Sequence, residues 1–117
     1  MKVIIAGSRH MPEDYDLLNK GIIASKFNIT EVVCGMARGA DTWGKKWAFP
    51  NIPVAEFPAL WNQHGKAAGY IRNKQMADYA DAALVFIWNG SRGSQNMIDT
   101  MRKLDKPVFV VHNGVVA

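Results

Sequence analysis

The sequence predicts an α/β fold, with a mostly parallel sheet of about five strands and helices on both faces. Five short apolar runs alternate with segments of helical periodicity, which is typical of parallel strands joined by helical crossovers. The run at 83–88 (ALVFIW) is apolar throughout, as expected for an inner strand buried on both faces. Polar, glycine-containing turns follow three of the runs and therefore fall at the carboxyl ends of predicted strands.

The first half of the chain supplies three of the predicted strands. Residues 2–6 form a short apolar run that ends in a tight loop, and Pro12 then suits the start of a helix. A second strand at 30–34 is followed by a glycine turn and a helix over about 40–49. The third strand, at 54–57, is short and flanked by prolines, so we expect it near an edge of the sheet.

The second half begins with the least regular stretch, a predicted loop at 58–68. The elements expected after it are a helix over about 70–79, the central strand, a helix ending near Leu104, a fifth strand at 108–111, and a tail that forms a frayed end or a small edge element.

Composition limits the classes of protein to consider. With 117 residues, 49% of them hydrophobic and 21% charged, the chain suits one globular domain over 1–117. No apolar run approaches the roughly 20 residues of a membrane-spanning helix, and the first apolar run is too short for a signal peptide, which predicts a cytoplasmic location. Cys34 is the only cysteine, so an internal disulfide is excluded, and the three histidines are too scattered to predict a metal site.

Net charge permits an anionic partner without identifying it. The formal charge is +4, but the basic residues form no dense run, so nucleic acid is expected to be an unlikely partner. Four tryptophans and many apolar residues favour a homo-oligomer. No cofactor is expected.

The turn after the central strand is the strongest candidate for a binding site. Residues 89–94 (NGSRGS) separate a strand from a helix, and the free N–H groups and dipole of a helix start favour an anion such as phosphate. The turns at 7–9 (GSR) and 35–41 (GMARGAD) should lie at the same edge of the sheet, where ligands of such folds bind. We therefore predict one ligand site built from three turns.

Each candidate residue has a structural alternative beside its binding role. Arg92 and Ser94 are predicted to bind phosphate, although the segment could also be an exposed turn with a serine cap. Asp41 could lie near the ligand or cap a helix, and Trp61 could stack on a base or pack in the core. The predicted ligand-binding residues are Gly7, Ser8, Arg9, Gly35, Arg38, Gly39, Asp41, Trp61, Lys66, Arg72, Asn73, Gly90, Ser91, Arg92, Gly93 and Ser94.

Four motifs in order resemble the YspA-like branch of the SLOG superfamily. They are GSR after the first strand, GxAxGAD after the second, GKxAGxxRN at 65–73 preceded by Trp61 and followed by Met76, and GxxGSxxM at 90–97. SLOG proteins are similar to the cytokinin-activating LOG enzymes and to the DNA-processing protein DprA. The resemblance implies a Rossmann-like three-layer sandwich that binds nucleotides or nucleotide-derived small molecules.

One departure from the LOG pattern bears on catalysis. The LOG signature PGGxGTxxE ends in a glutamate, and the aligned position here is Met97. Methionine cannot transfer a proton, and loss of such a group typically costs a factor of roughly 100 to 10,000 in rate. The catalytic residues are therefore unknown. Asp41, Asp81 and Glu56 are the carboxylates that could substitute.

Three functions follow, in order of preference. The first is capture of a nucleotide-derived ligand by a sensor or sequestering protein without efficient chemistry. The second is a LOG-like hydrolase of the N-glycosidic bond of nucleoside 5′-monophosphates that uses Asp41 or Asp81. The third is nucleic-acid binding like that of DprA.

Overall fold

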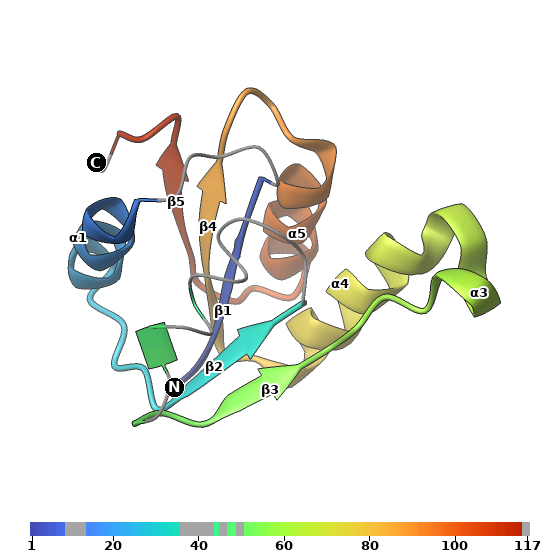
Figure 1. Cartoon of the computed structure of the whole chain (residues 1–117), viewed down its shortest axis with the longest axis horizontal. Helices are drawn as coiled ribbons and strands as arrows, with labels where there is room; N and C mark the ends of the chain where they lie inside the picture. Colours follow the sequence, from blue (N-terminus) through green and yellow to red (C-terminus); the bar gives the residue numbers. More distant parts are fainter. Residues whose placement is uncertain (9–13, 36–43, 45–46, 49–50, 116–117) are drawn as a thin grey trace.

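Five strands form one sheet in the order β3-β2-β1-β4-β5, and every neighbouring pair is parallel (Figure 1). The computed structural model describes residues 1–8, 14–35, 44, 47–48 and 51–115, with only the backbone of Trp61. The strands are β1 (Lys2–Gly7), β2 (Glu31–Cys34), β3 (Val54–Glu56), β4 (Ala82–Ile87) and β5 (Val108–His112). The helices are α1 (Tyr15–Ser25), α3 (Trp61–His64), the 3-10 helix η1 (Gly65–Ala67), α4 (Ala68–Tyr79) and α5 (Arg92–Lys103).

Alternation along the strands divides the core between the two faces of the sheet. Val3 and Ile5 of β1 pack with Leu18 of α1, whereas Ile4 packs on the opposite face with Met76 of α4. The second face also holds the buried residues of α5, and the first holds Ala48, one of the helical residues that follow β2. The predicted α/β architecture, a parallel sheet of five strands with helices on both faces, is therefore confirmed.

The apolar run predicted to be central is β4, and all six of its residues are buried. It pairs with β1 on one side and β5 on the other. The third strand, β3, lies at an edge as its length and prolines indicated. None of the helices in the described part of the chain is long and apolar enough to cross a membrane.

One segment is more regular than the sequence indicated, and the tail adopts the second of its two expected forms, a small edge element. The stretch expected to be a loop contains α3 and η1, because the carbonyl of Leu60 accepts hydrogen bonds from the N–H groups of Gln63 (3.0 Å) and His64 (2.9 Å) and so starts a helical turn. In the tail, Asn113 (φ 50°) and Gly114 (φ 80°) form a tight turn that brings Val115 back beside His112. An Asn-Gly pair favours such a turn because both residues tolerate positive φ.

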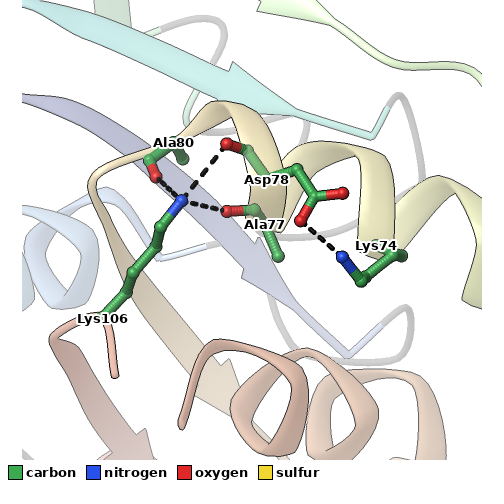
Figure 2. A network of polar contacts seen from close by, with 5 residues as sticks. All are labelled: Lys74, Ala77, Asp78, Ala80 and Lys106. Atoms are coloured by element: carbon green, nitrogen blue, oxygen red, sulfur yellow. Dashed lines mark hydrogen bonds and ion pairs between the residues drawn. The ribbon is translucent and has the colours of Figure 1, made fainter. Parts of the chain in front are cut away.

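A lysine from a distant turn closes the end of α4 (Figure 2). Lys106 Nζ donates hydrogen bonds to the carbonyl oxygens of Ala77 (2.7 Å), Asp78 (3.2 Å) and Ala80 (2.8 Å). The last carbonyls of a helix lack partners within the helix, and a cation is favourable there because of the helix dipole. Lys106 thus holds the α5–β5 turn against α4.

The Lys106→Met variant is expected to lose about 1–2 kcal/mol of unfolding free energy, because methionine keeps an apolar stem but donates no hydrogen bond. Urea denaturation followed by circular dichroism measures the loss. Lys103→Met, an exposed position at the end of α5, serves as the control and should change stability by less than about 0.5 kcal/mol. Equal effects of the two substitutions would contradict the capping role.

Candidate functional site at the carboxyl edge of the sheet

The candidate site lies where the order of the strands reverses. From β1 the chain builds the sheet outward through β2 and β3, and β4 then returns to the other side of β1. Ligands of open parallel sheets bind beyond the carboxyl ends of the strands at this point. Here those ends are Gly7 of β1, which pairs with Phe86 of β4, and the turn from β4 into α5.

Ser8 joins the two strands at the reversal point. Its N–H donates to the Phe86 carbonyl (3.1 Å), and its hydroxyl donates to the Trp88 carbonyl (3.2 Å) and accepts from the Trp88 N–H (2.9 Å). Only 4% of the residue is exposed. Although Ser8 was a candidate for ligand binding, its hydroxyl is engaged in holding the ends of β1 and β4 together.

The turn from β4 into α5 is braced by the tail of the chain. Asn89 and Gly90 have positive φ values of 51° and 70°. The Asn89 N–H donates to Asn113 Oδ1 (2.9 Å), and the Asn113 N–H donates to the Ile87 carbonyl (2.8 Å). Asn113 was not among the predicted site residues. Its Asn-Gly sequence signalled a turn but not the element that this turn would support.

The first turn of α5 presents backbone donors to solvent. Ser91 is the N-cap, and its hydroxyl accepts from the Ser94 N–H at 3.5 Å while its carbonyl accepts from the Gln95 N–H at 3.0 Å. The N–H groups of Arg92 and Gly93 have no hydrogen-bond partner among the described residues, and both residues are exposed. This arrangement suits an anion, because the positive end of the helix dipole coincides with free donors.

Two of the predicted site glycines differ in whether the described structure explains the absence of a side chain. A Cβ built on Gly35, directly after β2, would lie 2.7 Å from Cζ of Arg72, so an internal contact explains this glycine. A Cβ built on Gly93 would have nothing within 4 Å, and Gly93 does not have positive φ. Neither crowding nor backbone conformation in the described part of the chain therefore explains Gly93.

Ser94 carries a buried hydroxyl beside this turn. The residue is 5% exposed, and its Oγ has no hydrogen-bond partner among the described residues. Buried hydroxyl groups in folded proteins are normally satisfied. The side chain is therefore a free donor and acceptor in the first turn of α5.

Arg72 and Asn73 of α4 were predicted to bind the ligand, but their side chains form a chain of hydrogen bonds within the protein. Arg72 Nη1 donates to the Gly35 carbonyl (2.5 Å), and Arg72 Nε donates to Asn73 Oδ1 (3.0 Å). Asn73 Nδ2 donates to the Gly93 carbonyl (3.2 Å) and to Asn96 Oδ1 (3.0 Å). Asn96 was not predicted, because nothing in its sequence context distinguishes it from an ordinary helix residue.

The structure describes only some of the other predicted site residues. Lys66 lies exposed in η1, and Trp61 begins α3 rather than lying on an irregular loop, although its side chain is outside the described part of the structure. The remaining candidates, Arg9, Arg38, Gly39 and Asp41, lie outside the described residues.

The structure describes two of the three carboxylates considered for hydrolysis, and they lie at opposite ends of their strands. Asp81 accepts a hydrogen bond from the Lys2 N–H (2.8 Å) and lies at the amino end of β4, opposite the site, so the expectation that it could act there is wrong. Glu56 is the last residue of β3 and therefore lies at the carboxyl ends of the strands, but β3 is the outermost strand and β2 separates it from β1. Met97, which replaces the LOG glutamate, is 1% exposed and packs in the core between α5 and the sheet. Among the described residues there is no group of three side chains able to hold a metal ion.

Comparison with solved structures identifies the same fold in a DNA-binding protein. The chain superposes with a TM-score of 0.67 on DNA processing protein A (DprA) from Helicobacter pylori, at 22% identity, over 94% of this chain and 64% of that one. The chain thus spans less than two thirds of that protein. This similarity confirms the Rossmann-like fold implied by the SLOG resemblance, while membership of the YspA-like branch stays a prediction.

The same comparison corrects one expectation. The H. pylori protein has a described mode of single-stranded DNA binding. A protein of this fold therefore binds nucleic acid, which contradicts the expectation that nucleic acid is an unlikely partner. That view rested on the absence of a dense basic run in the sequence, but spacing along a chain does not give spacing in space. Three of the five arginines, Arg9, Arg38 and Arg92, follow the ends of β1, β2 and β4 within five residues.

Sequence comparison gives a relative of similar length. No protein-family model matches the chain. The Gene 61 protein of Mycobacterium phage D29 is 32% identical over 118 residues, and the alignment covers 92% of this chain and 94% of that protein. With this identity over almost the whole of both proteins, the chain belongs to the family of the phage D29 Gene 61 protein.

Proposed function

We propose that this protein binds single-stranded DNA through phosphate groups held at the first turn of α5. The observation that carries the proposal is Gly93. Gly93 is the second residue of α5, where glycine is less favourable than alanine by at most about 1 kcal/mol, the value for a helix interior, and no described contact or backbone angle requires it. A phosphate that approaches the N–H groups closely would supply the missing reason.

Neighbouring groups support an anionic ligand. The N–H groups of Arg92 and Gly93 and the hydroxyl of Ser94 are donors without partners among the described residues. The exposed guanidinium of Arg92 can form two parallel hydrogen bonds to one phosphate. Together these groups offer hydrogen-bond donors of several kinds to the oxygens of a phosphate.

Charge distribution favours a polyanion over a neutral partner. The two longest stretches without aspartate or glutamate are 57–77 and 82–98, and both include segments at the carboxyl edge. They carry the basic residues Lys66, Arg72 and Arg92 that were predicted for the site. The likeness in fold to DprA, for which single-stranded DNA binding is described, is a further reason to choose DNA.

A nucleotide-derived small molecule is the second candidate. The number of unpartnered donors at the first turn of α5 favours it, since two N–H groups and one hydroxyl are enough to bind a single phosphate group. A sensor or sequestering protein of the kind implied by the SLOG resemblance would use the same groups.

Fluorescence anisotropy with labelled oligo(dT) of 20 nucleotides tests the first candidate, with unlabelled duplex DNA as competitor. Isothermal titration calorimetry with nucleoside mono-, di- and triphosphates tests the second candidate directly. We expect binding that weakens steeply between 50 and 200 mM salt, because binding to phosphates releases counterions. Binding of mononucleotides without any binding of oligo(dT) would replace the first candidate by the second. Absence of binding to all of them would remove both.

The Gly93→Ala variant should be more stable and bind less tightly. Alanine should raise the unfolding free energy by at most about 1 kcal/mol, while its methyl group would obstruct the phosphate and lower affinity for oligo(dT) by about tenfold. Thermal denaturation and anisotropy measure the two effects. The control is Gln95→Ala, an exposed position two residues further along α5, which should leave affinity unchanged. Unchanged affinity in Gly93→Ala would contradict the proposed contact.

A further inference from the structure

We infer that Asn73 is a positioning residue that couples the first turn of α5 to the start of the loop after β2. The inference rests on the proposed function and deepens it, because it explains how two separate turns could act on one ligand. Asn73 was a candidate for direct ligand binding, but it is 6% exposed and its amide is already bonded to three partners. It therefore acts on the ligand through its neighbours.

The orientation of the Asn73 amide follows from its partners. Arg72 Nε can only donate, so the atom that faces it at 3.0 Å must be Oδ1. This places Nδ2 toward the Gly93 carbonyl and Asn96 Oδ1, both of which can accept. Each end of the amide thus has a distinct function, one toward Arg72 and the other toward α5.

Arg72 extends the same chain to β2. Its Nη1 donates to the carbonyl of Gly35, and the absence of a Cβ at Gly35 leaves the space that the guanidinium occupies. The route from Gly35 through Arg72 and Asn73 to Gly93 consists of three consecutive hydrogen bonds. Because α4 supplies both middle residues and packs against α5, a shift of one turn is transmitted to the other.

The Asn73→Asp variant separates the two functions of the amide. The carboxylate keeps the size of the side chain and can still accept from Arg72 Nε, but it cannot donate to Gly93 or Asn96. The matched control is Gln75→Glu, an exposed residue of the same helix that undergoes the same change of amide to carboxylate. We expect affinity for oligo(dT) to fall about tenfold in Asn73→Asp and less than about twofold in Gln75→Glu.

A double-mutant cycle distinguishes positioning from general destabilisation. If Asn73 acts through the first turn of α5, then Asn73→Asp should cause little further loss of affinity when Gly93→Ala is already present. Losses of affinity that multiply in the double variant would overturn the inference. Asn96→Ala is the milder variant, since it removes one of the two acceptors and keeps the bond to Gly93, and it should lower affinity about threefold.

A measurement without ligand keeps this inference separate from the proposed function. In amide NMR spectra of the free protein, Asn73→Asp should shift the resonances of both Gly35 and the first turn of α5, whereas Gln75→Glu should shift neither. Shifts confined to α4 would overturn the coupling. If wild-type protein does not bind oligo(dT), the proposed function fails while these spectra still decide the role of Asn73.

Discussion

Reversal of charge in Arg92→Glu is expected to weaken binding of oligo(dT) by tenfold to a hundredfold, because a hydrogen bond to a charged group contributes about 1.5–3 kcal/mol. Arg92 is exposed at the first position of α5, beside the free N–H groups. A carboxylate there would repel phosphate. Folding should not suffer, since a negative charge at a helix start is favourable by about 0.3–1 kcal/mol.

Arg102→Glu is the matched control for this prediction. Arg102 is also exposed and lies in the last turn of the same helix, so the net charge changes by the same amount at the opposite end. It should slightly lower stability and reduce affinity by less than about threefold, through long-range repulsion alone. In Arg92→Glu the slope of log affinity against log salt should become shallower by about 0.7 for each phosphate that the variant no longer binds. Equal reductions of affinity in the two variants would show that binding depends on net charge and not on the first turn of α5.

Truncation of Phe86 to alanine is expected to lower the unfolding free energy by about 3–5 kcal/mol. Phe86 is fully buried in β4, and its ring passes so close to α1 that a Cβ on Gly21 would lie 2.8 Å from Cζ. The hydrogen bond from the Ser8 N–H is to the backbone carbonyl of Phe86, which alanine retains, so the loss comes from the side chain alone. Because domains of this size are stable by only about 5–15 kcal/mol, the variant would be close to unfolding.

Phe109→Ala provides the comparison in urea denaturation. Phe109 lies in the neighbouring strand β5, at the edge of the sheet, and is only partly buried. The same truncation there should cost about half as much, since less apolar surface is removed from contact. An equal cost at both positions would contradict the central role assigned to β4.

Much of the fold was predictable because it depends on local patterns. The six apolar residues of β4 can be buried on both faces only in the interior of a sheet, and the prolines around β3 exclude it from the centre. The helix at α3 was not predicted, since a segment of four residues has too little periodicity to be distinguished from a loop.

The described candidate residues lie where the sequence predicted them, at the carboxyl ends of the strands or after them, but the sequence assigned them roles too uniformly. Glycines, serines and arginines at strand ends were all predicted to bind the ligand. The structure instead uses the side chain of Ser8 to join two strands and the side chain of Arg72 to hold Gly35. Gly93 and Ser94 are among the predicted residues for which the described structure offers no such internal use, and the exposed side chains of Lys66 and Arg92 are the others.

The sequence by itself determined the fold class, the order of the five strands along the chain, and the ends of the strands at which the polar turns follow. These follow from periodicity and turn chemistry over a few residues. Only the tertiary structure decided which polar side chains are free and which are engaged. The partners of Ser8, Arg72 and Asn73 lie 80, 37 and 20 residues away in the chain, and hydrogen bonds between such distant residues exist only once the sheet and helices have packed.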